Sequence, residues 1–262
     1  MRIEPIPAFA DNYIWLLRQP QDPRVAVVDP GDAQPVLDYL AAQHLELTAI
    51  LITHHHRDHI GGVAALQSAW PRAEVIAPED PRIPGATHSV GDGERFRLEG
   101  LEIDLQVLAV PGHTSSHIAY LTAEADHPAL FCGDTLFSVG CGRVFDGTVE
   151  QLAVSLRRIA ALAPETRCYC AHEYTLENIG FARWVEPENP ALAERALEAE
   201  RLRAAQKPTV PTILASELAT NPFLRVDQPE VMVAAERAAG HKLNGPTEIF
   251  AALRRWKDDD YD

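Results

Sequence analysis

Cysteine is scarce in this chain, and long apolar runs are missing. Only four of the 262 residues are cysteines, and the sequence contains no CxxC motif. We therefore expect no disulfide framework and predict reduced thiols. The four positions are Cys132, Cys141, Cys168 and Cys170. The longest apolar runs, such as 49–52 and 107–110, are far shorter than the roughly 18 residues of a membrane-spanning helix, so no membrane segment is predicted.

Basic residues are outnumbered by acidic ones, at 23 Lys and Arg against 38 Asp and Glu, which gives a formal net charge of −15 at pH 7. Such a charge disfavours general attraction to nucleic acid or to anionic membranes, so neither is an expected partner. An anionic substrate would need a local basic patch. Residues 1–5 lack the apolar stretch and cleavage site of a secretory signal, so we expect a cytoplasmic location.

The first two thirds of the chain carry β-rich runs that alternate with helical patterns. This alternation predicts a sheet-based domain whose sheets are covered by helices. Helical spacing marks 34–45 and 148–162, and the second of these opens with a capping box between Thr148 and Gln151. The expected strands are 25–29, 47–53, 74–77, 101–110, 117–122, 129–132 and 167–171.

After about residue 173 the β pattern ends and only helix signals remain. Asn189 and Pro190 read as the N-cap and first turn of a helix to about residue 206. Asp227 is expected to cap a further helix that ends near Gly240. A final helix covers about 246–257 with an apolar stripe. The predicted domains are therefore 1–172, which is sheet-based, and 173–262, which is helical.

The densest chemical signal is the segment Thr53-His54-His55-His56-Arg57-Asp58-His59. It lies between an expected strand and a helix-like segment, and within six residues it offers four candidate metal ligands, His54, His56, Asp58 and His59. Imidazole nitrogens and carboxylate oxygens suit Zn²⁺ and similar divalent ions. A solvated, histidine-rich surface loop is the alternative interpretation of this segment alone.

Three further candidate ligands each follow an expected strand: His113, Asp134 and His172. A single histidine or aspartate is more often structural, but carboxyl ends of strands are where α/β sheets place ligands. Together with the first segment they make five histidines and two aspartates, which exceeds the three protein ligands of a mononuclear catalytic zinc. Two metal ions that share a bridging carboxylate are the more economical interpretation.

Four segments of the chain resemble the ligand-bearing motifs of the metallo-β-lactamase superfamily. The resemblance rests on HHHRDH at 54–59, PGHT at 111–114, CGDTLF at 132–137 and AHEYT at 171–175. Within that superfamily the chain is similar to the glyoxalase II (hydroxyacylglutathione hydrolase) family. Three more specific segments carry this second likeness, namely GCGR at 140–143, TNPFLR at 220–225 and RRWKD at 254–258.

The resemblance implies an α/β (α+β) fold, the αββα sandwich of that superfamily, followed by a C-terminal helical domain. It implies two divalent ions, zinc in the first instance, with iron or manganese also suited to these ligands. His55 is not a ligand in the family. The implied ligands are His54, His56 and His113 for the first ion, Asp58, His59 and His172 for the second, and Asp134 between the two, with Asp58 and Asp134 also counted as catalytic.

The implied reaction is hydrolysis of S-D-lactoylglutathione and other S-2-hydroxyacylglutathiones to D-lactate and glutathione, a step of methylglyoxal degradation. A hydroxide held between the metal ions would attack the thioester carbonyl. The residues agree, because no Gly-x-Ser-x-Gly segment or other nucleophile signature is present. We expect a monomer whose only partner is the glutathione thioester.

The resemblance also implies which side chains bind the glutathione moiety: Arg143, Tyr174, Arg254 and Lys257. Arg254 and Lys257 are three residues apart, so a helix would present them on one face. A solvated basic helix end is the alternative. One departure from the family concerns Phe145, where some members carry an aromatic hydroxyl, so a hydrogen bond to the substrate backbone is in question.

Three other functions share parts of this pattern. A persulfide dioxygenase of the same superfamily uses one iron and also carries HxHxDH, but it lacks the helical tail. A nuclease or lactonase would need a basic groove or a different insert, and the acidic balance argues against the nuclease. A non-catalytic metal-binding or redox-sensing module would not need complete ligand sets for two ions.

Overall fold

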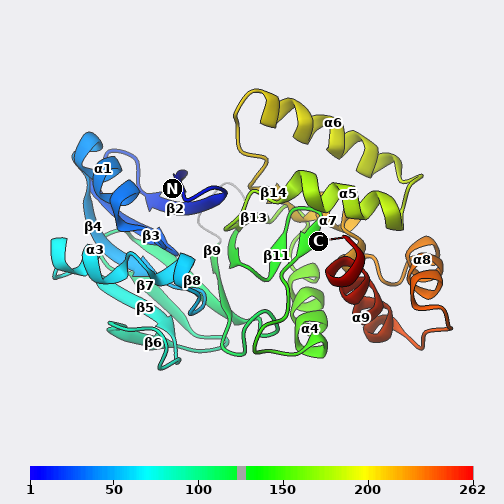
Figure 1. Ribbon diagram of the computed structural model, residues 1–262. Helices are drawn as coiled ribbons and strands as arrows, with labels where there is room; N and C mark the ends of the chain where they lie inside the picture. The colour runs from blue at the N-terminus through cyan, green and yellow to red at the C-terminus, as the bar shows by residue number, and fades with distance from the viewer. Residues whose placement is uncertain (123–127, 262) are drawn as a thin grey trace. The chain divides into compact units, whose positions relative to one another are not determined.

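The computed structural model describes residues 1–122 and 128–261 (Figure 1). They form two compact units that interleave along the chain. Unit 1 comprises Met1–Ala109, Ser116–Gly133 and Tyr169–His172, and unit 2 comprises Val110–Ser115, Asp134–Cys168 and Glu173–Asp262. The predicted domain boundary between residues 172 and 173 stays a prediction.

The first sheet of unit 1 has the strand order β1-β2-β3-β4-β5-β6. The pairs β1–β2 and β2–β3 are antiparallel, whereas β3, β4, β5 and β6 run parallel. The strands are β1 (Arg2–Ala8), β2 (Asn12–Arg18), β3 (Arg24–Val28), β4 (Glu46–Leu51), β5 (Glu74–Pro78) and β6 (His88–Val90). Three helices connect them: α1 (Ala33–Gln43), α2 (Arg57–Ile60) and α3 (Val63–Ala69).

The second sheet of unit 1 is antiparallel in the order β10-β9-β8-β7. Its strands are β7 (Arg95–Leu98), β8 (Ile103–Ala109), β9 (Ile118–Thr122) and β10 (Ala129–Gly133). The hydroxyl of Tyr120 on β9 donates to the carbonyl oxygens of Ile52 and Ile76 at 2.9 and 3.0 Å. Tyr120 is fully buried, so this contact joins the two sheets through the interior of the unit.

The core of unit 1 explains why the sequences of its central strands are continuous apolar runs. Alternate residues of β3 and β4, such as Val25 and Ile50, pack against Val36 and Leu40 of α1. The intervening residues, such as Ala26 and Leu51, are buried as well. Strands buried on both faces lose the polar alternation of a half-exposed strand.

Unit 2 is mainly helical, with a short two-stranded hairpin of β11 (Leu136–Phe137) and β12 (Gly140–Cys141). Strand β13 (Arg167–Cys170) begins in unit 2, where Arg167 and Cys168 pair with β14 (Thr212–Ile213). The helices are α4 (Val149–Ala160), α5 (Thr175–Val185), α6 (Pro190–Ala204), α7 (Leu214–Thr220), η1 (Pro222–Leu224), α8 (Pro229–Ala239), α9 (Pro246–Trp256) and the π-helical turn η2 (Lys257–Tyr261).

Several helix signals are confirmed. The capping box of Thr148 and Gln151 opens α4, Asn189 accepts from two backbone N–H groups at the start of α6, and Gly240 ends α8 with φ of 75°. The predicted cap at Asp227 is wrong, because α8 starts at Pro229 after Gln228. Proline at the first position fixes φ and needs no hydrogen bond there, so it sets the start.

The β pattern also extends further than predicted. Strands β1 and β2 precede residue 25, and the short β14 lies beyond residue 173. Strand β1 contains Pro5 and Pro7, which argue against a strand in sequence. It is an edge strand, where prolines are tolerated because one side of the backbone needs no partner.

Candidate metal centre

Unit 1 places the histidine-rich segment directly after strand β4. His54 and His59 are fully buried, and the rings of His54, His56 and His59 lie close together, with centroids 4.8 Å apart for His54 and His56 and 4.0 Å for His54 and His59. Asp58 and His59 belong to the single turn of α2. A solvated surface loop is therefore the wrong interpretation of this segment.

His172 is brought to the same place by β2. The backbone N–H of Tyr13 donates to Ala171 at 2.7 Å, and the indole N–H of Trp15 donates to Cys170 at 2.9 Å. These bonds hold the 169–172 segment of unit 1 beside β2. Asp58, His59 and His172 consequently offer ligand atoms that lie within 4.8 Å of one another.

The spacing of these ligand atoms fits a shared metal ion. The Oδ2 atom of Asp58 lies 3.5 Å from Nε2 of His59 and 3.4 Å from Nε2 of His172. Two ligand atoms bound tetrahedrally at about 2.1 Å from one ion lie about 3.4 Å apart. The three side chains thus have the donor chemistry and the separations of a divalent metal site.

The opposite nitrogen of each of these histidines is held by a carboxylate. Nδ1 of His59 donates to Asp29 at 2.9 Å, and Nδ1 of His172 donates to Asp11 at 2.9 Å. A carboxylate acceptor keeps the proton on Nδ1, so the lone pair is on Nε2, the atom that faces Asp58. Outer carboxylates that orient histidine ligands in this way are typical of metal sites.

Asp29 also organises His54. The Thr53 hydroxyl donates to Asp29 at 2.7 Å, and its oxygen lies 3.0 Å from Nδ1 of His54. The backbone N–H of Thr53 donates to the other carboxylate oxygen at 2.7 Å. Asp29 therefore fixes the ring orientations of two predicted ligands, His54 and His59.

Asp58 is ionised at neutral pH. Partial burial tends to raise its pKa, but contacts with His172 and His59 and a hydrogen bond from Asn12 hold the pKa well below its usual range. A carboxylate that stays charged is the form that binds a cation.

Gly31 permits the close approach of the loop after β3 to α2. A Cβ atom at this position would lie 1.8 Å from the carbonyl oxygen of Asp58, which no side chain allows. The backbone at Gly31 therefore packs directly on the turn that carries Asp58 and His59.

Unit 2 brings together the two remaining predicted ligands. Nε2 of His113 lies 3.5 Å from Oδ2 of Asp134, the same separation as in the unit 1 cluster, and both residues are buried. Nδ1 of His113 donates to the carbonyl oxygen of Arg143 at 2.8 Å. This bond again leaves the lone pair on Nε2, the atom that a metal ion would need.

The four predicted substrate-binding residues all lie in unit 2. The Arg143 side chain is half-exposed, and its Nε lies 3.6 Å from Asp258. Tyr174, the N-cap of α5, contacts the edge of Phe137 with ring centroids 5.2 Å apart. Phe145 is 64% exposed and packs edge-on against His113.

Arg254 and Lys257 lie on the buried face at the end of α9, while Arg255 is exposed. The Arg254 guanidinium donates to both oxygens of Asp258, at 2.8 and 3.1 Å, and to the carbonyl oxygen of Cys141 at 3.1 Å. Lys257 lies over the ring of Tyr261, 5.7 Å from its centroid. The solvated helix end is thus wrong, although the substrate-binding role itself stays a prediction.

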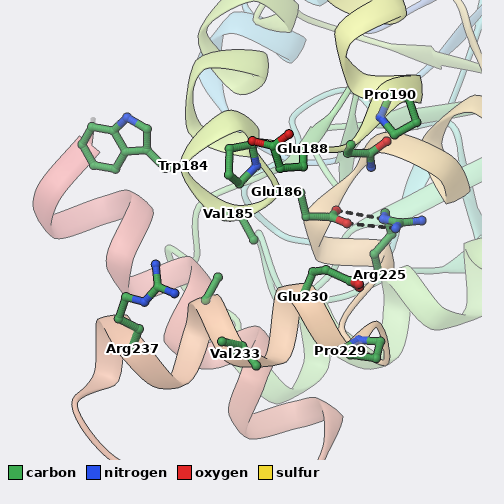
Figure 2. A pocket seen from close by; sticks show the side chains of 13 residues that line it. Trp184, Val185, Glu186, Glu188, Pro190, Arg225, Pro229, Glu230, Val233 and Arg237 are labelled. Atoms are coloured by element: carbon green, nitrogen blue, oxygen red, sulfur yellow. Dashed lines mark hydrogen bonds and ion pairs between the residues drawn. The ribbon is translucent and has the colours of Figure 1, made fainter.

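A separate cavity of about 640 Å³ lies elsewhere in unit 2 (Figure 2). Its lining includes Trp184, Val233 and Arg237 and none of the predicted site residues. This cavity therefore has no part in the metal-binding chemistry.

Two orienting carboxylates, Asp11 and Asp29, are absent from the residues that the sequence predicts for the site. Asp29 also follows a strand, so the position shared by the other candidates is a signal for it. Its context, Asp29-Pro30-Gly31, is equally typical of a turn, which hides that signal. Asp11 is 161 residues from His172 in sequence, and no local signal links them.

Known proteins resemble the chain over its full length. The profile described as "Metallo-beta-lactamase superfamily" matches residues 9–172, and the one described as "Hydroxyacylglutathione hydrolase C-terminus" matches residues 173–259. A hydroxyacylglutathione hydrolase from Xanthomonas euvesicatoria pv. vesicatoria (strain 85-10) is 55% identical over 262 residues, with 99% of each chain covered. The chain belongs to the hydroxyacylglutathione hydrolase family.

A second hydroxyacylglutathione hydrolase, from Pseudomonas paraeruginosa (strain DSM 24068 / PA7), is 52% identical over 259 residues, which cover 98% of this chain and 99% of the relative. Among solved structures, the BLEG-1 B3 metallo-beta-lactamase matches with a TM-score of 0.64 at 23% identity, covering 85% of this chain and 99% of that one. This likeness concerns the fold alone. Together with the C-terminal profile it confirms the predicted sandwich with a C-terminal helical domain.

Within the described residues, no helix combines the length and the apolar character that crossing a membrane requires.

Proposed function

We propose that this hydroxyacylglutathione hydrolase family member cleaves S-D-lactoylglutathione, and other S-2-hydroxyacylglutathiones, to a 2-hydroxy acid such as D-lactate and glutathione. The observation that carries the proposal is the cluster of Asp58, His59 and His172, in which both histidines present Nε2 to one carboxylate oxygen. Full-length similarity to proteins named hydroxyacylglutathione hydrolase supports the substrate class. A cytoplasmic monomer stays our expectation.

We assign two divalent ions, zinc in the first instance, to the seven predicted ligands. His54, His56 and His113 would hold the first ion, and Asp58, His59 and His172 the second, with Asp134 shared. The separations of 3.4 to 3.5 Å within Asp58–His59–His172 and within His113–Asp134 support this assignment. When bound, such ions polarise a carbonyl oxygen and activate water for attack near neutral pH.

The protein's own contribution is to hold these ligands in one protonation state and orientation. Asp29, Asp11 and the carbonyl oxygen of Arg143 each accept the Nδ1 proton of a histidine ligand. Fixed tautomers mean that no proton has to move before the ligand atoms can act. Residues that are locked in this way keep a catalytic geometry within the narrow limits that hydrolysis needs.

A protein nucleophile is not required in this scheme. All four cysteines are buried thiols, and burial raises the pKa of Cys141 to about 11, so this thiol stays protonated at neutral pH. A protonated, buried thiol is a poor nucleophile. Activated water is then the attacking group.

For the glutathione moiety we assign Arg143, Tyr174, Arg254 and Lys257. Asp258 lies against both Arg143 and Arg254. A carboxylate of the substrate would approach guanidinium groups that already accommodate a carboxylate. Phe145 cannot donate a hydrogen bond through its ring, so the substrate backbone gains no contact of that kind from this position.

The test is metal analysis of the purified protein together with a thioesterase assay on S-D-lactoylglutathione. We expect about two metal ions per chain and hydrolysis that Lys257→Ala weakens mainly through KM, because a contact remote from the reacting carbonyl binds ground and transition states alike. A matched thioester that lacks the glycine carboxylate should be cleaved equally poorly by wild type and by Lys257→Ala. One iron per chain with oxygen consumption on glutathione persulfide would instead favour the dioxygenase.

A further inference from the structure

The hairpin β11–β12 leads directly to Arg143, and its backbone is buried. Phe137, Ser138 and Cys141 are at most 5% exposed, and Val139 is fully buried. The ladder pairs only Leu136 with Cys141 and Phe137 with Gly140, so it satisfies few of these backbone groups. Buried backbone N–H and C=O groups need partners, and here side chains from the surrounding helices provide them.

One side chain from the 220–225 motif holds two of these carbonyls. Nδ2 of Asn221 donates to Gly140 at 2.9 Å and to Phe137 at 3.3 Å. Asn178 of α5 donates to the carbonyl oxygen of Ser138 at 3.0 Å. The side-chain amides of Asn221 and Asn178 therefore both hydrogen-bond to carbonyl oxygens of the hairpin.

Glu217 accepts from a backbone N–H group of the turn. The backbone N–H of Val139 donates to its carboxylate at 2.7 Å, and Asn221 donates to the same oxygen at 3.0 Å. Val139 has φ of 60°, a left-handed conformation that favours glycine and strains a β-branched residue. Its side chain packs with Ile179 and Leu192 in a buried cluster. The helices thus hold a turn that the hairpin would not adopt by itself.

The motif that supplies Asn221 is itself anchored. Arg225 makes a paired contact with the carboxylate of Glu186, at 2.8 and 2.9 Å (Figure 2), and donates to the carbonyl oxygen of Leu218 at 3.1 Å. The side-chain oxygen of Asn221 accepts from the N–H of Phe223 at 3.1 Å. Both ends of the 220–225 segment are fixed, so Asn221 has little freedom to move.

We propose that Asn221, Asn178 and Glu217 are positioning residues for substrate binding, which hold the β11–β12 hairpin so that Arg143 is aimed at the carboxylate-bearing end of a glutathione thioester. This proposal rests on the proposed role of Arg143. In this scheme the 220–225 segment acts through Asn221, which holds the hairpin that carries Arg143. None of the three side chains touches the substrate in this scheme.

The experiment compares Asn221→Asp, Asn178→Ala and Glu217→Gln with Arg143→Ala. Asn221→Asp keeps the volume and the oxygen that accepts from Phe223 but removes the amide donor. We expect Asn221→Asp and Asn178→Ala each to raise KM for S-D-lactoylglutathione roughly five- to tenfold, with kcat within about twofold of wild type. Glu217→Gln keeps an acceptor for Val139 and should retain the wild-type KM, whereas Glu217→Ala should not.

A double variant separates positioning from general destabilisation. In an Arg143→Ala background, Asn221→Asp should have no further effect on KM, because its target side chain is gone. Asn244→Ala is the matched control, since it removes an exposed asparagine of the same unit whose side chain contacts Glu248 and not the hairpin or its supports, and it should leave KM unchanged. Thermal unfolding of every variant shows which remain folded, and Asn178→Ala is the safer choice because alanine favours a helix.

The outcomes are distinct. Folded Asn221→Asp and Asn178→Ala variants with wild-type KM would overturn the positioning role while leaving the proposed function intact, and so would an additive effect in the double variant. The dissociation constant of glutathione, measured by calorimetry, gives a readout without turnover. If wild type did not hydrolyse the thioester but these variants still weakened glutathione binding, the proposed reaction would fail and the positioning role would stand.

Discussion

Asp29 offers a direct test of how unit 1 prepares its metal ligands. Its buried carboxylate accepts from the N–H and hydroxyl of Thr53 and from Nδ1 of His59. In Asp29→Asn, the remaining oxygen can stay on the Thr53 N–H, but an amide NH₂ then faces His59. That group donates to Nδ1, so the ring proton moves to Nε2, the atom proposed to bind the metal.

The expected loss follows from the geometry. Nε2 of His59 lies 3.5 Å from Asp58, and a protonated Nε2 has no lone pair for an ion there. Removal of a carboxylate behind a histidine ligand typically lowers metal affinity about 10- to 100-fold. That range equals about 1.4 to 2.8 kcal/mol of binding free energy. Asp29→Asn should weaken zinc binding at the site of His59 by this amount without unfolding the chain, and it also removes the acceptor of the Thr53 hydroxyl that orients His54.

The assay is competition for zinc between the metal-free protein and a chromophoric chelator at pH 7. Asp38→Asn is the control, because Asp38 is an exposed residue of α1 whose carboxylate accepts from the nearby Gln34 side chain on the same helix. Wild type and Asp38→Asn should give the same two affinities. If folded Asp29→Asn bound zinc as tightly as wild type at both sites, the tautomer argument would be refuted.

Four further predictions concern other side chains. Asp134→Ala should abolish thioester hydrolysis yet leave the circular dichroism spectrum largely unchanged; a variant that keeps turnover would contradict the shared-ligand assignment. Cys141→Ser should keep kcat and metal content, because the buried thiol has its pKa raised to about 11; loss of turnover with metal retained would restore a thiol mechanism. Asp258→Ala should lower the unfolding free energy by about 1 to 3 kcal/mol, measured in urea, because Arg254 is left buried without its carboxylate; unchanged stability would show that Arg254 is held otherwise. Burial raises the pKa of Glu217, an effect that hydrogen bonds from Thr212 and Val139 only partly offset, so ionised Glu217 costs stability. The stability that the protonated Glu217 carboxyl provides is fully present below pH 4.5 and is lost as the pH rises through the pKa of the folded state. In urea titrations, the stability of Glu217→Gln relative to wild type should therefore increase with pH above 4.5. A stability difference that does not change with pH would argue against the burial cost.

The sequence predicted those parts of the fold that are encoded locally. Runs buried on both faces identified β3, β4 and β10, and the capping box of Thr148 identified the start of α4. Helix α5 was not located in the sequence, because it lacks the usual start signals. Its N-cap is Tyr174, which makes no side-chain cap hydrogen bond, and no proline or acidic residue marks the cap position. Strand β1 was missed because its prolines are acceptable only at a sheet edge, and an edge is a property of the whole sheet.

The proposed metal ligands could be predicted for a similar reason. His54, His56, Asp58 and His59 are close in sequence because one loop supplies them all, and repetition of the strand-end position suggested the others. The residues that orient them are different, since Asp29 lies 30 residues from His59, and Asp11 lies 161 residues from His172. No spacing rule relates such pairs, because only the packing of β2 and β3 brings them together.

This difference limits what a metal motif means by itself. A chain could carry HxHxDH and still present the wrong ring nitrogen if the carboxylates at Asp29 and Asp11 were replaced by groups that donate. The motif supplies donor atoms, whereas the non-local contacts decide which of those atoms has a lone pair in the right direction. In unit 2 a backbone carbonyl, that of Arg143, performs this task for His113, so any side chain can satisfy position 143 in that respect. The role of the arginine side chain is therefore separate from this contact, and the one that we propose is recognition of an anionic thioester by its half-exposed guanidinium.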